Sequence, residues 1–161
     1  MRISDPYAEA EHDRRLAGSL RAGTICDIDH RSARARVRIG EWISDWIPWS
    51  SGFAGEMRRW RPPSIGEQVV LASPSGLPEG GFILPGYYTT EHPAPDERKT
   101  ATVDLWPDGA RVEYDWATKK YLIDIPETGK IVLKIGRTTL ELRDDGVLLK
   151  TPKFEGEEWT P

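Results

Sequence analysis

The chain has 161 residues, of which 38% are hydrophobic, and its formal net charge is -4. This length suits one ordinary domain or two small ones, and the slight negative charge excludes a global basic footprint for nucleic acid. No apolar run approaches the ~20 residues of a membrane span, and the N-terminus does not resemble a secretory signal. Cys26 is the single cysteine, which excludes an internal disulfide framework. The modest apolar content favours folding as an oligomer.

The first 20 residues predict a helical arm. Asp5 can cap the helix, Pro6 suits its first position, and Gly18 and Gly23 mark its end. The apolar face of this arm is thin. The pattern therefore leaves two interpretations open, a solvated arm and an arm that docks on a neighbouring subunit.

Residues 21–88 predict a small, closed or nearly closed barrel of about five strands. Arg34, Arg36 and Arg38 alternate with apolar residues, a period of two that indicates one buried face and one charged face. Residues 29–32 before them fit a hairpin turn. Short strands with tight corners are typical of small barrels. Further strands are predicted at 42–49, 67–72 and 81–86.

Residues 89–100 predict a linker, because they are rich in proline and charge and coincide with a change of composition. Residues 1–98 contain 12 Arg and no Lys, whereas residues 99–161 contain seven Lys and three Arg. We expect this change to separate two domains.

Residues 101–151 predict a ladder of short strands with turn signals every few residues. Apolar residues alternate with charged ones along these strands, yet nothing in the remaining sequence can cover the apolar face. Such a face must find a partner. The strands are predicted at 101–106, 110–116, 119–125, 130–135, 137–143 and 146–150.

Three identical chains wrapped around a common axis would cover these faces. The predicted fold is therefore all-β, with an N-terminal small barrel followed by strands that form an intertwined homotrimer. A β-sandwich formed with another copy is the alternative. The predicted trimer core consists of Val103, Leu105, Val112, Tyr114, Ile131, Leu133, Ile135, Leu140 and Leu142.

Patterns that carry catalytic or cofactor chemistry are missing from the sequence. His12, His30 and His92 share no near spacing with each other or with a cysteine, so zinc is not expected. Neither a phosphate-binding glycine loop nor a nucleophile elbow occurs. We expect a structural protein that is not an enzyme and that holds no catalytic residues, cofactor or metal.

An OB-type module that binds single-stranded nucleic acid is the alternative function for the first domain. Arg34, Arg36 and Arg38 share one strand face, and other arginines lie near Trp60. Such modules need exposed aromatic side chains interleaved with the basic ones. The tryptophans instead flank a proline at an expected barrel corner, so we expect no nucleic-acid binding.

Four sequence blocks, in order over roughly residues 16–150, resemble phage baseplate assembly protein V. This family forms the central spike of contractile tails and is related to type VI secretion spike proteins. The blocks lie at 45–49, 63–69, 82–88 and 106–114. The signature residues are Trp46, Pro48, Trp49, Pro63, Gly66, Glu67, Gln68, Pro85 and Gly86.

The resemblance implies an all-β fold with an N-terminal OB-like barrel, the collar domain at residues 21–88, followed by an intertwined homotrimeric triple-stranded β-helix at residues 101–151. It implies a spike in the baseplate of a virion or phage-tail-like particle, assembled in the bacterial cytoplasm. It implies contacts with baseplate hub and tail-tube proteins and a transient contact with the target cell membrane. Many members end in a His-x-His motif that binds iron, but no histidine follows His92 here, and residues 152–161 form an acidic tail. Either a separate tip-capping protein completes the point or this is a shortened form; we expect the separate protein.

Overall fold

The computed structural model describes Tyr7, residues 18–74 and residues 76–156. The chain divides into two compact units, Met1–Pro93 and Ala94–Pro161. This division falls within the predicted linker at residues 89–100. The helical arm predicted for residues 1–20 lies almost entirely outside the described residues and stays a prediction. The described elements are strands and one short 3-10 helix, which confirms the all-β class.

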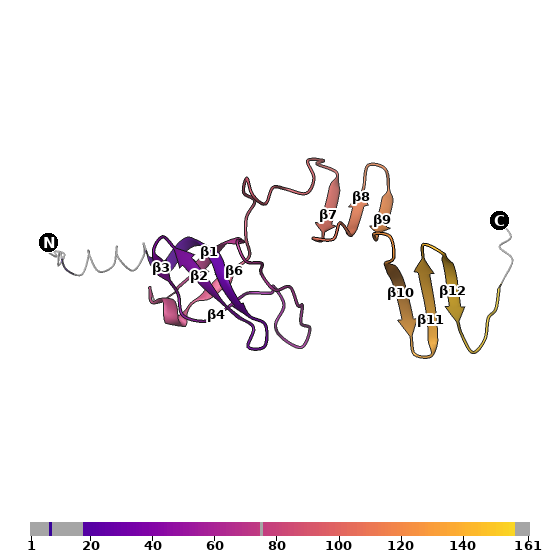
Figure 1. Ribbon diagram of the computed structural model, residues 1–161, viewed down its shortest axis with the longest axis horizontal. Coiled ribbons are helices and arrows are strands. Elements are labelled where there is room, and N and C mark those ends of the chain that lie inside the picture. The colour runs from indigo at the N-terminus through magenta and orange to yellow at the C-terminus, as the bar shows by residue number, and fades with distance from the viewer. Residues whose placement is uncertain (1–6, 8–17, 75, 157–161) are drawn as a thin grey trace, which may run out of the picture. The chain divides into compact units, whose positions relative to one another are not determined.

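The first unit contains six short strands, one more than the sequence predicts (Figure 1). They are β1 (Leu20–Asp29), β2 (Arg34–Ile39), β3 (Trp42–Ile43), β4 (Ile47–Pro48), β5 (Gln68–Ala72) and β6 (Phe82–Leu84), with the 3-10 helix η1 (Pro78–Gly80) between the last two.

These strands form a sheet that closes into a small barrel. The sheet order is β3-β2-β1-β5-β6, and β4 also pairs with β2. A bridge between Trp49 and Ile83 joins the end of β4 to β6, and the amide of Ser50 donates to the carbonyl of Ile83 at 2.8 Å. Joining the two ends of a sheet in this way is what defines a barrel, and the result is consistent with an OB-like domain.

The alternation predicted for β2 is confirmed. Ala35 and Val37 are completely buried, whereas Arg34 and Arg38 are exposed. The apolar side chains of β2 meet those of the neighbouring strands inside the barrel. The buried core consists of Ile25, Ala35, Val37, Ile47, Val69, Leu71 and Ile83.

The single strand predicted at 42–49 is wrong, because buried Ser44 divides it into β3 and β4. The Ser44 hydroxyl accepts the amide of Val37 at 2.9 Å and donates to the carbonyl of Asp45 at 2.7 Å. The amide of Ser44 donates to the carbonyl of Val37 at 2.9 Å. A side chain thus replaces a backbone group in the ladder, and the strand breaks there.

The second unit consists of two three-stranded antiparallel sheets, β7-β8-β9 and β10-β11-β12. All six predicted strands are present, each within one residue of its predicted ends. They are β7 (Ala101–Leu105), β8 (Arg111–Asp115), β9 (Lys120–Asp124), β10 (Lys130–Ile135), β11 (Thr138–Arg143) and β12 (Gly146–Lys150).

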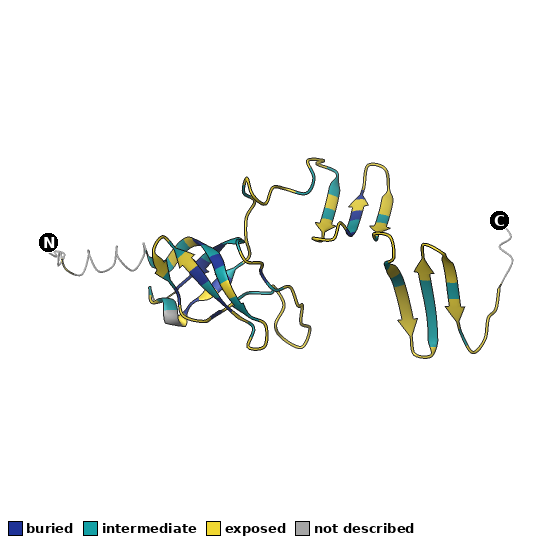
Figure 2. Ribbon diagram, viewed as in Figure 1, coloured by how far each residue is buried: buried dark blue, intermediate teal, exposed yellow. Residues whose placement is uncertain are grey.

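Most side chains of the second unit are open to solvent within one chain (Figure 2). Among its described residues, only Ala110, Glu113 and Asp115 are buried. Two of these three are acidic, the reverse of an ordinary core. The described residues therefore do not supply the apolar cover that these strands require.

The buried acids of β8 belong to an ion-pair cluster with the predicted linker. The Arg98 guanidinium lies 2.7 Å from Asp96, 2.8 Å from Glu113 and 3.3 Å from Asp115. Arg111 lies 2.5 Å from Asp96 and 2.7 Å from Glu113. Asp96 and Arg98 come from the segment predicted to be a linker, so its second half is fixed to β8 in this unit.

The pKa of each acid in the cluster is lowered. Hydrogen bonds from Arg98 are the largest cause for both Asp96 and Glu113, and they hold each pKa below its ordinary value. The pKa of Asp115 is lowered mainly by the backbone amide of Ala117, which donates at 2.9 Å. An acid whose pKa is lowered on folding stabilises the fold above its ordinary pKa, and this contribution is lost as the pH falls.

Replacing Asp96 by Asn tests the cluster. Near neutral pH the wild type should melt at a higher temperature than Asp96→Asn, because Arg98 and Arg111 lose a charged partner. The difference should shrink as the pH falls below the ordinary carboxyl value of 3.8. Thermal unfolding followed by circular dichroism at several pH values measures it. Glu97→Gln, an exposed neighbour outside the cluster, is the control, and a difference that stays constant through this range would contradict the prediction.

Candidate functional site

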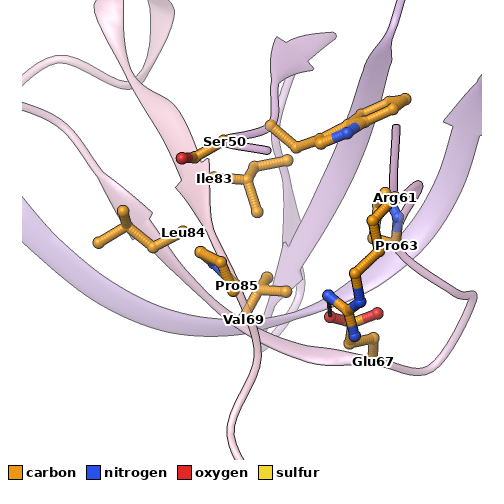
Figure 3. Close-up of a pocket in the computed structure, with 9 residues that line it drawn as sticks. Ser50, Arg61, Pro63, Glu67, Val69, Ile83, Leu84 and Pro85 are labelled. Atoms are coloured by element: carbon orange, nitrogen blue, oxygen red, sulfur yellow. Dashed lines mark ion pairs between the residues drawn. The ribbon is translucent and has the colours of Figure 1, made fainter. Parts of the chain in front are cut away.

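Four of the predicted signature residues gather at one corner of the barrel. Trp49, Pro63, Glu67 and Pro85 all line the same pocket (Figure 3). Trp49 follows β4, Pro63 and Glu67 precede β5, and Pro85 follows β6. Segments that are distant in the sequence therefore meet at this corner, which explains why the signature comes in separate blocks.

Glu67 fixes the loop that leads into β5. Its carboxylate accepts the amide of Ser64 at 3.0 Å and lies 3.7 Å from the Arg61 guanidinium (Figure 3). Its backbone carbonyl accepts the amide of Ile25, in β1, at 2.9 Å. One residue thus joins the loop to the barrel through both its side chain and its backbone.

Two signature glycines have backbone reasons for their identity. Gly66 has a φ of +87°, in the left-handed region that favours glycine. Gly86 packs so closely that a β-carbon there would lie 2.5 Å from the carbonyl oxygen of Gln68. Gln68 itself donates to the hydroxyl of Thr24 at 2.9 Å and accepts from the hydroxyl of Tyr87 at 3.3 Å.

The pocket at this corner is too small for an organic ligand. Its volume of about 10 Å³ holds roughly one water molecule, whereas small-molecule sites occupy roughly 300–1,000 Å³. Beside it, the rings of Trp49 and Trp60 pack with centroids 5.5 Å apart. The corner is therefore a structural joint of the barrel.

Arginine side chains lie on aromatic rings around the barrel. The guanidinium of Arg36 is 5.8 Å from the centre of the Trp46 ring, and that of Arg21 is 4.8 Å from Trp42. Arg34 also donates to the carbonyl of Trp46 at 2.8 Å. These arginines and tryptophans are separated in the sequence, and the fold of the barrel brings them together.

The sheet β10-β11-β12 has one face without charges. Leu133 pairs with Leu140, and Leu140 pairs with Leu149, so these side chains share a face. Leu133 is 59% exposed and Ile135 84% exposed within the chain. The face, here called the apolar face, consists of Ile131, Leu133, Ile135, Thr138, Leu140, Leu142, Val147 and Leu149.

The opposite face of this sheet is charged. Lys130 and Arg143 lie 3.4 Å and 3.9 Å from Glu141. Sequence reasoning placed five members of the apolar face in its predicted core and missed Val147 and Leu149. The alternation in residues 146–150, counted across the turn at 144–145, would have found them.

The predicted core residues of the first sheet do not share a face. Val103 pairs directly with Glu113 in β8. Val112 and Tyr114 flank Glu113 in that strand, so they point to the opposite side. Leu105 lies two residues from Val103 and shares its face. One core-forming face therefore cannot include all four residues, and the prediction needs correction here.

Comparison with known proteins agrees with the barrel. Residues 21–88 match a family described as the type VI secretion system/phage-baseplate injector OB domain. The chain is also 34% identical over 118 residues to the spike protein of Escherichia phage P2. That alignment covers 73% of this chain and 56% of the phage protein, so the chain spans about half the length of its relative. The predicted resemblance to baseplate assembly protein V is confirmed.

Two further features of the described residues bear on function. No group of three or more His, Cys, Asp or Glu side chains in the described part of the chain is arranged to hold a metal ion. No helix among the same residues is long and apolar enough to cross a membrane. The exposed features considered below are the faces of the two three-stranded sheets and the surface formed by the pairs Arg21–Trp42 and Arg36–Trp46.

Substitution of Gly86 by Ala tests the barrel joint. The new β-carbon would meet the Gln68 carbonyl, so the OB domain should lose about 1–3 kcal/mol of unfolding free energy. A β-carbon added at Gly55 would have nothing within 4 Å, so Gly55→Ala is the matched control and should be neutral. Chemical denaturation of both variants measures the difference. Equal stability of the two would show that the backbone near Gly86 adapts freely.

Proposed function

We propose that the chain is a structural spike protein of a contractile injection system, with no catalytic role. The observation that carries the proposal is the apolar face of β10-β11-β12. The described residues leave this face exposed to solvent, whereas the opposite face of the same sheet is charged. The match of residues 21–88 to an injector OB domain and the identity to a phage spike protein support the same role.

The proposed assembly is a homotrimer in which three apolar faces form one dry core. In each sheet of the second unit the outer strands pair on one side only with the part of the chain that the structure describes. Such edges and faces are open to pairing with another chain. Three copies wound around one axis would cover the apolar faces and pair the outer strands at the same time, and they would form the triple-stranded β-helix.

A spike of this kind would act mechanically. Contraction of a sheath would supply the work, and continuous strand pairing between three chains would supply stiffness for piercing a cell envelope. The OB collar would contact baseplate hub and tail-tube proteins. The particle would be a virion or a phage-tail-like assembly, built in the bacterial cytoplasm.

The end of the spike is proposed to bind a separate tip-capping protein. Beyond β12 the one large apolar side chain among the described residues is the exposed Phe154, and Lys153 pairs with Glu155. Three acidic tails on one axis would repel each other. A separate protein that covers the last apolar positions, near Leu149, would complete the point without requiring the tails to meet.

A charge on the apolar face should break the trimer. Leu133→Lys would bury an unpaired ammonium in each copy, at a cost of about 3–5 kcal/mol per chain. Analytical ultracentrifugation should therefore find a trimer for the wild type and smaller species for this variant.

The adjacent substitution Val132→Lys is the matched control. Val132 lies on the opposite face, directly across from Glu141, so a lysine there should leave the trimer intact. A wild-type protein that is a stable monomer at micromolar concentration would refute the proposed assembly.

Nucleic-acid binding by the OB domain is the second candidate function, favoured by the arginine–aromatic pairs. In these pairs each guanidinium already lies over an aromatic ring, so neither side chain is available to stack on a base or bind a phosphate. We therefore propose that the surface is structural. Titration with a single-stranded oligonucleotide at ~150 mM salt should show no saturable micromolar binding, and sub-micromolar affinity would favour the nucleic-acid function instead.

A further inference from the structure

The two faces of β7-β8-β9 differ in charge. One face, called the charged face, carries five ionisable side chains: Arg111, Glu113, Asp115, Lys120 and Asp124. The other, called the tyrosine face, carries Thr102, Asp104, Val112, Tyr114, Tyr121 and Ile123. The tyrosine face therefore has one charged residue, and that residue lies on the outer strand β7.

The charged face is already covered by the chain. Arg98 reaches Glu113 and Asp115 from the segment before β7, and Asp96 reaches Arg111. Glu113 and Asp115 are only 7% and 5% exposed as a result. Another copy that approached this face would first have to displace the linker and break these ion pairs.

The tyrosine face lacks such cover. Tyr114 and Tyr121 are 43% and 65% exposed, and Ile123 is 42% exposed. The two tyrosine rings lie side by side, with centroids 6.3 Å apart. Exposed tyrosines beside aliphatic side chains are typical of protein interfaces, where the ring is buried and the hydroxyl finds a polar partner.

We infer that β7-β8-β9 contacts two further copies of this chain through its tyrosine face, while Val103 and Leu105 remain outside beside the linker. This inference rests on the trimer proposed above. Residues 125–129 connect β9 to β10, so copies that cover the apolar face of β10-β11-β12 belong to the same assembly as this sheet. Burying the charged face instead would remove the exposed Lys120 and Asp124 of each chain from water.

Two introduced cysteines distinguish the faces. Leu105 and Tyr121 are 54% and 65% exposed in the single chain, so a monomer would expose a thiol at either position to a similar degree. The variants Leu105→Cys and Tyr121→Cys, each in a Cys26→Ser background, are reduced and then treated with a maleimide. Their labelling rates are compared in native protein, and their mass is measured by analytical ultracentrifugation.

We expect both variants to be trimers, with the thiol at position 121 labelled at least ~10-fold more slowly than the thiol at position 105, because a thiol at an interface reacts only while that interface is open. Slower labelling at position 105, equal protection at both positions, or fast labelling of both within a trimer would overturn the inference. If the wild type and both variants are monomers and both thiols are labelled quickly, the proposed trimer is refuted instead.

A second pair of variants keeps the test independent of labelling. Ile123→Lys places a charge on the tyrosine face, whereas Leu122→Lys places it on the charged face, opposite Glu113. The first should dissociate the trimer and the second should not, with circular dichroism confirming that both are folded. Dissociation by Leu122→Lys alone would overturn the inference.

Discussion

The constraint on which this structure depends is that every sheet must have its apolar side chains covered, either by its own curvature or by another layer. The barrel covers its own apolar side chains, because its sheet closes on itself and encloses a core of seven buried residues. A three-stranded sheet is too narrow to close, so each of its two faces needs cover from elsewhere. The linker covers one face of β7-β8-β9, and the chain offers no described cover for the apolar face of β10-β11-β12.

The barrel corner shows how a sequence signature can mark architecture without marking a ligand site. Glu67, Gly66 and Gly86 are where they are because a loop must meet β1 and β5 at short distances. The tryptophans nearby pack on each other or on arginines. The signature residues therefore hold the barrel together, whereas the apolar face and the tyrosine face, which we propose to form the trimer, lie outside the signature.

Strand positions could be predicted from the sequence because they depend on local information. Alternation and turn residues lie within a few positions of each strand, and all six strands of the second unit followed from them. The break at Ser44 could not be predicted, since it depends on a hydrogen bond to Val37 in another strand. The same holds for the faces of β7-β8-β9: whether Val103 joins Val112 or opposes it depends on the pairing register, which alternation within one strand does not determine.

The attachment of Arg98 and Asp96 to β8 also has a mechanical meaning. A segment joined to a sheet only by its backbone would pass a push or a twist to the outer strand β7. In the proposed spike, the ion pairs would pass part of that force to the central strand β8, which is paired on both sides. In the proposed spike, the cluster would therefore distribute an axial load over all three strands of the sheet.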